Sequence, residues 1–125
     1  MSFLPSMNNI RFEEQEFYNW LNTVVDYDGP VGLTAKFYVK KDQVAKFCQM
    51  MKNNVEYSVG KKGVLVYKMQ ADYRDSNIFW LIEKWESVAD LKAHCLSETY
   101  KKNADQLSFL LEEPDCQIGL YKAMR

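Results

Sequence analysis

The chain has 125 residues, of which 47% are hydrophobic, 26% charged and 14% aromatic, and its formal net charge is -1. This length supplies one hydrophobic core but hardly two, so we expect a single folding unit. The near-zero charge, with lysine pairs scattered at 40–41, 61–62 and 101–102, argues against nucleic acid or an anionic membrane surface as a partner.

The sequence shows neither a targeting segment nor a metal-binding motif. The first residues, MSFLPSMNN, lack a basic region followed by a long apolar run, and no stretch approaches the roughly 18 apolar residues of a membrane span. Cys48, Cys95 and Cys116 are an odd number without CxxC spacing, which favours neither a disulfide framework nor a zinc site. We therefore expect a cytoplasmic protein without a metal site, whose cysteines are small core side chains.

The first part of the chain predicts a helix, a strand and a second helix. Apolar residues recur with helical spacing over residues 10–27, and the DYDGP that follows is typical of a helix end. The apolar stripe of this first helix consists of Phe17, Trp20, Leu21 and Val24. Residues 31–40 alternate between apolar and polar side chains, as a strand with one buried face does. A second amphipathic helix follows and ends at the glycine-bracketed GKKG.

The next part predicts a hairpin and a long helical region. The runs 64–73 and 78–86 read as strands, and the polar RDSN between them has the composition of a hairpin turn, so we expect the strands to pair antiparallel. Ser87, with Asp90 three residues later, resembles a capping box. It opens a helical region that we expect to reach about Leu111.

The element order indicates the fold class. Pro114 is expected to end the helical region, and the alternating CQIGLYKAM then predicts a last strand. After the N-terminal helix the order is β-α-β-β-α-β, which is the ferredoxin-like α+β pattern of a four-stranded antiparallel sheet with helices on one face. We accordingly divide the chain into an N-terminal helical extension, 1–30, and a ferredoxin-like domain, 31–125.

The predicted strand 78–86 is apolar on both faces. One face carries Ile78, Trp80 and Ile82, and the other carries Phe79, Leu81 and Trp85. Two helices cover only one face of a sheet, so the second face requires a partner's sheet or the N-terminal helix as cover. A self-complementary sheet face suits two-fold symmetry, and we therefore expect a homodimer joined through the sheets.

The same region carries a distinctive motif, N.FWLIEKWES...LKAH..SETY. Its defining residues are Asn77, Phe79, Glu83, Trp85, Ser87, Leu91, His94, Ser97 and Tyr100, with GVLVY (Gly63, Leu65, Tyr67) upstream. Together with VGLTAKFYVKKDQVAKF, this pattern resembles the antibiotic biosynthesis monooxygenase family of dimeric α+β barrels over residues 31–124. The chain departs from the family pattern at Lys61, where an acid is common, and in its extension 1–30.

The resemblance implies a fold and a pocket but leaves the reaction open. It implies two sheets packed face to face into a shared barrel, with a small-molecule pocket between sheet and helices in each subunit. Members include cofactor-free oxygenases of quinols and polyphenols, sugar-phosphate isomerases and haem degraders, and fold alone does not choose among these. The tryptophan and histidine of the haem-degrading branch fall here on His94 and Ala104, which disfavours haem degradation.

His94, the only histidine, is the predicted catalytic residue. It follows Leu91 by three positions and directly precedes Cys95, so it lies on or beside the buried stripe of its helix. An ordinary histidine pKa of about 6.5 suits a general base that removes a phenolic proton near neutral pH. The alternative, equally open, is a structural histidine whose hydrogen bond holds the helix to the sheet.

Four further side chains are candidates for binding a substrate. They are Tyr67, Asn77, Trp85 and Tyr100. The tyrosines and the asparagine would donate hydrogen bonds to a substrate oxygen, and the tryptophan would form part of the wall, although each of them also suits a structural role. Glu83 shares a strand face with Trp85 and requires a partner if buried, so we interpret it first as a structural anchor.

These expectations combine into one functional hypothesis with two alternatives. The chain is expected to be a cofactor-independent monooxygenase that uses dioxygen to oxidise a small electron-rich aromatic substrate such as a quinol, with no flavin or metal. One alternative is a non-catalytic dimer that binds a small ligand. The other is an isomerase of the same fold.

Overall fold

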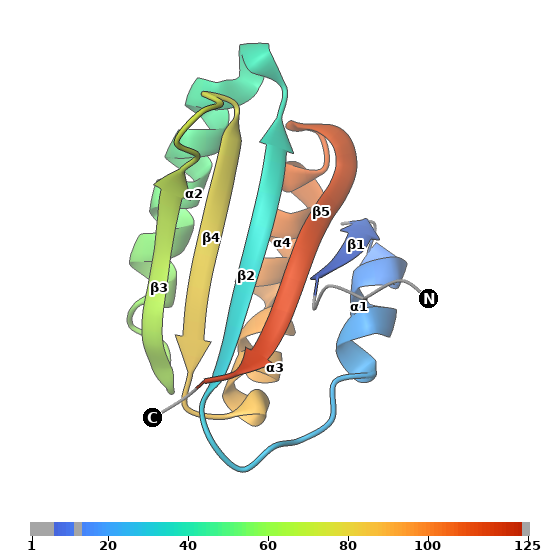
Figure 1. Ribbon diagram of the computed structural model, residues 1–125, viewed down its shortest axis with the longest axis vertical. Coiled ribbons are helices and arrows are strands. Elements are labelled where there is room, and N and C mark those ends of the chain that lie inside the picture. The colour runs from blue at the N-terminus through green and yellow to red at the C-terminus, as the bar shows by residue number, and fades with distance from the viewer. Residues whose placement is uncertain (1–6, 12–13, 124–125) are drawn as a thin grey trace.

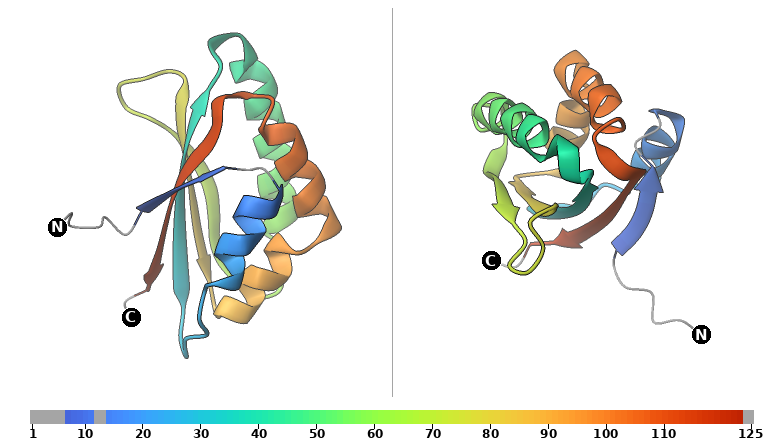
Figure 2. Two further views of the ribbon diagram at one scale, coloured as in Figure 1. Left: turned by 90° about the vertical axis from the view of Figure 1, so that its right-hand side faces the viewer. Right: turned by 90° about the horizontal axis from the view of Figure 1, so that it is seen from above.

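The structure, a computed structural model, describes residues 7–11 and 14–123. Its elements are β1 (Met7–Arg11), α1 (Glu14–Asn22), β2 (Val31–Val39), the 3-10 turn η1 (Lys41–Gln43), α2 (Val44–Ser58), β3 (Val64–Ala71), β4 (Ile78–Trp85), α3 (Val88–Cys95), α4 (Glu98–Leu107) and β5 (Leu111–Lys122). The strands form one antiparallel sheet in the order β1-β5-β2-β4-β3, and the helices lie on one of its faces (Figures 1 and 2). Among the described residues no helix has the length and apolar character needed to cross a bilayer.

The ferredoxin-like α+β fold and the extra N-terminal helix are confirmed, but the N-terminal segment also contributes a fifth strand. Residues 10 and 11, expected to begin the helix, belong to β1, which pairs with β5 so that Ile10 lies opposite Cys116. The helix itself ends at Asn22, because the next amide, on Thr23, bonds to the Trp20 carbonyl in a tighter turn. An open strand edge offers unpaired backbone groups, and β1 satisfies those of β5.

The last strand begins earlier than expected and contains Pro114. On β5, Leu111 pairs with Val39 and Cys116 pairs with Phe37, so the strand carries an irregularity between these two pairs. Proline has no amide hydrogen and is tolerated in a strand at such a bulge. Pro114 therefore lies within β5, and the preceding helix ends at Leu107 without it.

The helical region after β4 consists of two helices, each started by a serine. The Ser87 hydroxyl accepts a hydrogen bond from the Asp90 amide at 3.1 Å, which confirms the predicted N-cap of α3. The Ser97 hydroxyl accepts from the Tyr100 amide at 3.2 Å and donates to the His94 carbonyl at 2.7 Å. Ser97 thus joins the end of α3 to the start of α4, and it determines how His94 and Tyr100 lie relative to each other.

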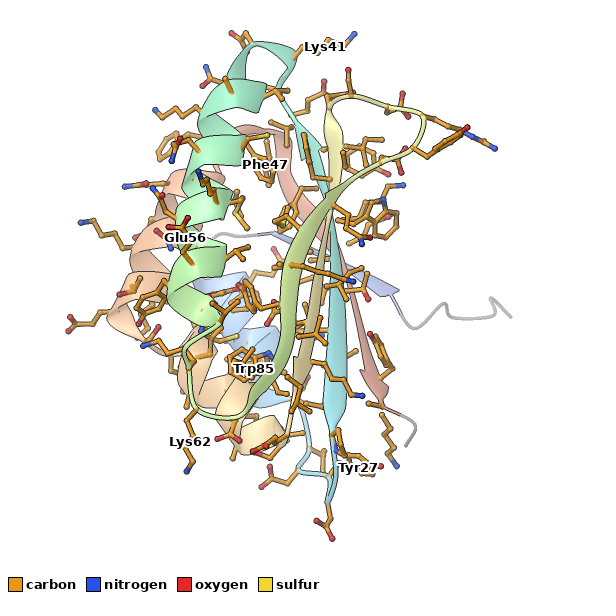
Figure 3. All side chains as sticks on the ribbon, turned by 90° about the vertical axis from the view of Figure 1, so that its left-hand side faces the viewer. Tyr27, Lys41, Phe47, Glu56, Lys62 and Trp85 are labelled. Atoms are coloured by element: carbon orange, nitrogen blue, oxygen red, sulfur yellow. The ribbon has the colours of Figure 1, made fainter. Side chains whose placement is uncertain are left out.

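The core lies between the inner sheet face and the helices. Alternate residues of β2, from Val31 to Val39, are buried on this face, and Figure 3 shows Phe47 of α2 and Trp85 of β4 pointing into the layer between helix and sheet. The helix α1 lies on the same side, beside α4 (Figure 2). The N-terminal helix, one of the two covers expected for the second sheet face, therefore does not cover it, and Trp80 and Ile82 remain half-exposed on that face.

Candidate functional site

A cavity of about 30 Å³ lies between the inner sheet face and the helices α2 and α4. Its lining combines apolar side chains from both layers with a few polar groups: Phe17, Leu33, Ala35, Phe37, Met50, Met51, Asn54, Tyr67, Leu81, Glu83, Tyr100, Asn103, Ala104, Leu107 and Ile118. This volume is of the order that holds a water molecule. A few polar groups converging on an otherwise apolar space are typical of a ligand site.

Glu83 is the acid of this cavity. It faces inward from β4, because alternate residues of that strand point to the helices, and its side chain is 3% exposed. One carboxylate oxygen, Oε1, accepts a hydrogen bond from Nε1 of Trp85 at 2.8 Å. Burial raises the pKa of Glu83 to about 7, and the hydrogen bond from Trp85 opposes that shift. Near neutral pH this carboxyl group can therefore both accept and release a proton.

Tyr67 lies next to Glu83 and belongs to a short chain of hydrogen bonds. The two residues are direct cross-strand partners on β3 and β4. Asn103 donates to the side-chain oxygen of Asn54 at 3.3 Å, and Asn54 donates to the Tyr67 hydroxyl at 2.9 Å. Burial, and then the charge of Glu83, raise the pKa of Tyr67 well above its ordinary value. The tyrosine therefore remains a neutral hydroxyl beside the acid.

Tyr100 supplies a second phenol from α4. Its ring stacks on Phe17 of α1, with ring centroids 5.6 Å apart and an angle of 28° between the planes. Burial raises the pKa of Tyr100 well above its ordinary value, and the nearby Cys95 and Glu83 act in the same direction. The cavity thus places two neutral phenols and one carboxyl group around a space lined mainly by apolar atoms.

His94 lies behind this cavity in an aromatic cage. Its side chain is 3% exposed, and its ring centroid is 5.4 Å from that of Tyr67, 4.9 Å from Trp85 and 5.2 Å from Tyr100. Among the described residues neither of its ring nitrogens has a hydrogen-bond partner. Burial, and secondarily the charge of Lys61, lower the pKa of His94 to about 4. The imidazole is therefore neutral near pH 7, and it is not one of the residues that line the cavity.

Comparison with known proteins identifies the family. A family model described as antibiotic biosynthesis monooxygenase matches residues 30–106, a range that contains Tyr67, Glu83, His94 and Tyr100 but not α1 or β5. The chain belongs to the antibiotic biosynthesis monooxygenase family. A comparison with curated proteins finds no significant match.

Solved structures of similar fold come from several microorganisms. A conserved protein from Methanosarcina mazei is 23% identical, with a TM-score of 0.73, over 78% of this chain and 95% of that one. A candidate antibiotic biosynthesis monooxygenase from Nitrosomonas europaea is 20% identical, with a TM-score of 0.73, over 81% and 96%. A Bacteroides thetaiotaomicron protein described as a possible oxidoreductase is 15% identical, with a TM-score of 0.71, over 78% and 100%. At these identities the likeness establishes the fold alone.

The predicted site residues of this family member do not all meet at the cavity. Tyr67 and Tyr100 line it. Trp85 is fully buried, holds Glu83 through its ring nitrogen and packs against His94, so it belongs to the cage. Asn77 lies just before β4, where its side-chain amide donates to the Val39 carbonyl at 3.2 Å, and it does not line the cavity.

Three polar residues of the cavity are not among the predicted site residues. The sequence presents Glu83 as a structural anchor and predicts no role for Asn54 and Asn103. An acid on the buried face of an alternating strand was the available signal for Glu83, because such a group is costly to bury. Asn54 follows Met51 by three positions on the apolar stripe of α2, so a polar residue on a helical stripe was the corresponding signal there. Asn103, on a mostly polar helix, offered no such signal.

The arrangement suits proton transfer and orientation of a small aromatic compound. A carboxyl group with a pKa near neutrality can take a proton, the phenols and the amide of Asn103 can hold an oxygen atom in place, and the apolar wall excludes water. Over the described part of the chain, no three histidine, cysteine, aspartate or glutamate side chains are grouped so as to hold a metal ion.

Proposed function

We propose that this protein is a cofactor-independent monooxygenase that oxidises a small electron-rich aromatic, such as a quinol or another phenol. The observation that carries the proposal is Glu83, a buried carboxyl group with a pKa of about 7 at a cavity that two neutral tyrosine hydroxyls also line. Membership of the antibiotic biosynthesis monooxygenase family supports the oxygenase class. The substrate and its position are the proposed part.

The proposed reaction needs a base more than it needs a cofactor. Once the base has removed the phenolic proton, the phenolate transfers one electron to dioxygen, and the resulting radical pair combines at the para carbon to form a peroxide. Loss of water from this peroxide gives a quinone. The balance is one phenol with a free para carbon plus one O₂, giving one quinone plus one H₂O. A quinol, whose para carbon carries a hydroxyl, reacts instead at a free ortho carbon, and one quinol plus one O₂ gives one hydroxyquinone plus one H₂O. The protein contributes deprotonation, orientation and a dry environment.

Glu83 is better supported as the base than His94, the base predicted from the sequence. The Glu83 carboxyl lines the cavity, whereas His94 lies behind the rings of Tyr67 and Tyr100. A base is most effective when its pKa is near the working pH. Glu83, at about 7, meets that condition, and His94, at about 4, is a weak base. Within the proposal, His94 supports the two tyrosine rings from behind.

Oxygen uptake tests the proposal. With 1-naphthol as substrate and no added flavin, we expect the wild-type protein to consume one O₂ per naphthoquinone formed, equally well after dialysis against EDTA. If Glu83 is the base, kcat/KM rises with pH through about 7, where the carboxyl ionises, and Glu83→Gln lowers it roughly 10²- to 10⁴-fold. Uptake no faster than without protein, across a panel of phenols, would contradict the oxygenase proposal.

His94→Phe is the matched control for the identity of the base. It keeps an aromatic ring in the cage and removes the imidazole. We expect this variant to retain most of the activity and the same pH profile. If His94 is the base instead, kcat/KM is constant from pH 5 to 8, because the pKa of His94 is about 4, and His94→Phe abolishes turnover while Glu83→Gln retains it.

A second candidate is a non-catalytic protein that binds a small ligand, and the few polar groups around the apolar cavity favour it, because they suit binding whether or not a reaction follows. Under either candidate the cavity has to enlarge, since about 30 Å³ is less space than a single aromatic ring occupies. Tight binding of phenols without oxygen uptake would support this candidate over the oxygenase.

Under either candidate, we propose that the chain is a homodimer joined through the outer sheet face. The cytoplasmic location expected from the sequence stays a prediction.

A further inference from the structure

The helix α1 forms one wall of the cavity although it lies outside the family match. The match begins at residue 30, and α1 ends at Asn22. In Figure 2 this helix lies beside α4, on the same side of the sheet as the other helices. It contributes Phe17 to the cavity lining, and that side chain is 2% exposed. This chain therefore builds part of its pocket from its own N-terminal extension.

Phe17 fills space against Tyr100. The two rings are stacked, with centroids 5.6 Å apart. The space left beside them is about 30 Å³, whereas an apolar cavity that holds one benzene molecule measures about 150 Å³. A phenolic ligand therefore cannot enter unless a side chain moves. Phe17 already presents an aromatic ring to Tyr100, as such a ligand would.

Side-chain packing and hydrogen bonds hold α1 against the rest of the molecule. It is a nine-residue helix, too short to be stable without packing. The Tyr18 hydroxyl donates to the Cys95 carbonyl at 3.1 Å, and the Lys92 ammonium donates to the Val24 carbonyl at 2.7 Å. Residues 23–30, which contain neither helix nor strand, connect it to β2. The strands that form the opposite wall are held by antiparallel backbone ladders.

We propose that Phe17 is the specificity-determining residue of the pocket: its ring occupies the place against Tyr100 that the aromatic ring of a phenolic ligand takes when the Phe17 side chain turns away. This inference rests on the pocket proposed above but not on its oxygen chemistry. The closed arrangement reduces ligand affinity by the fraction of molecules that are open. Removing the ring makes the space permanent, so small phenols bind more tightly.

Binding of 4-fluorophenol, followed by ¹⁹F NMR under argon, tests this inference without turnover. We expect Phe17→Ala to bind the phenol roughly tenfold more tightly than the wild-type protein does, and Phe17→Leu, which keeps more of the packing of α1, to show a smaller gain. Leu21→Ala is the matched control. Leu21 is 1% exposed on the same helix but does not line the cavity, so its truncation weakens α1 without removing the ring, and we expect wild-type affinity.

Three results would overturn the inference. The first is unchanged affinity in both Phe17 variants, and the second is no binding by any variant. The third is a gain in affinity in Leu21→Ala as large as in Phe17→Ala, because it would attribute the opening of the pocket to loosening of α1 rather than to loss of the ring. If Phe17→Ala does not fold, as judged by circular dichroism, Phe17→Leu decides between the outcomes. Absence of oxygen uptake alongside the expected gain in binding would count against the oxygenase proposal alone.

Discussion

Glu83 and His94 are buried in one cluster, and burial favours the neutral form of each. For the carboxyl group this raises the pKa from its ordinary 4.5 to about 7, and for the imidazole it lowers the pKa from 6.5 to about 4. The folded protein therefore holds a protonated Glu83 and an unprotonated His94 between pH 4.5 and 6.5. On unfolding in that range, the glutamate releases a proton and the histidine takes one up.

The two groups should cancel in the pH dependence of stability. Alone, Glu83 makes the free energy of unfolding fall as pH rises from 4.5 to 7, because the folded state binds the extra proton. Alone, His94 makes it rise from pH 4 to 6.5, because the unfolded state binds the extra proton. We expect the free energy of unfolding of Glu83→Gln to rise by on the order of 3 kcal/mol between pH 4 and 6.5. That of His94→Phe should fall by a similar amount between pH 4.5 and 7.

Urea unfolding at half-unit pH steps measures both slopes. Each variant should reveal the slope of the group that remains, relative to a nearly constant contribution from the pair in the wild-type protein. The glutamine keeps an acceptor for the Trp85 ring nitrogen, and the phenylalanine loses no hydrogen bond that the structure shows, so neither change adds a second effect. Parallel curves for all three proteins would contradict the pKa shifts.

Sequence reasoning at the residue scale found the elements of the site better than its chemistry. The resemblance to the antibiotic biosynthesis monooxygenase family pointed to the strand and helix that carry Glu83, His94 and Tyr100, and helical spacing placed His94 correctly on a buried face. The pKa of His94 is lowered because side chains from other elements enclose its ring, here Tyr67 of β3 and Trp85 of β4. Periodicity within one helix does not contain that information.

Ser97 connects the two helices that the sequence presents as one region. Loss of an N-cap side chain typically costs about 1 kcal/mol, and Ser97 also donates to the His94 carbonyl. We expect Ser97→Ala to lower the free energy of unfolding by about 1 to 2 kcal/mol and Ser97→Thr, which keeps the hydroxyl, to stay within about 0.5 kcal/mol of the wild-type value. Chemical denaturation measures both.

The turn at Ser97 also positions Tyr100, so the two variants should differ in ligand binding. If phenols bind beside Tyr100, Ser97→Ala weakens their binding and Ser97→Thr does not. Equal stability of the two variants would mean that the cap hydrogen bond, 3.2 Å long, contributes little.

Elements with strict alternation were predicted closely, and those decided by long-range pairing were not. The predicted strand 31–40 and hairpin correspond to β2, β3 and β4 within a few residues, because the buried face fixes the period and the turn residues fix the ends. The strand β1 has its partner, β5, about a hundred residues away in the sequence. No local pattern in a five-residue segment announces such a pairing, and the nearby helical stripe concealed it.

At the scale of the whole molecule, the two faces of the sheet differ in cover. The helices bury the inner face, whereas on the outer face Lys36 extends over the rings of Tyr38 and Trp80, at 5.0 and 5.2 Å from their centroids. The lysine stem and the two rings, with Ile82 beside them, make this face amphipathic. The sequence predicts either α1 or a partner's sheet as the cover of the outer face. Because α1 packs on the helical side, the sheet of a second copy of the chain is the remaining one of these two.

A substitution at Ile82 tests the dimer proposal most directly. It faces outward from β4, with Thr34 and Lys68 as its cross-strand neighbours, so it lies near the middle of the proposed interface. Two-fold symmetry introduces any substitution there twice, and two glutamates buried in one interface repel each other and lose their hydration. We expect Ile82→Glu to weaken dimerisation by at least about 3 kcal/mol, or more than roughly a hundredfold in Kd, while Lys68 limits the cost to the monomer fold.

Sedimentation velocity from 1 to 100 μM measures this effect, with Tyr73→Glu as the matched control. Tyr73 is 98% exposed in the connection between β3 and β4, so the same charge there should leave the sedimentation coefficient unchanged. The wild-type protein should sediment as a dimer and Ile82→Glu as a monomer with an unchanged circular dichroism spectrum. A wild-type monomer over the whole concentration range would contradict the dimer. A dimer that persists in Ile82→Glu would place the interface elsewhere, because the outer face cannot close over two opposed carboxylates without a large loss of affinity.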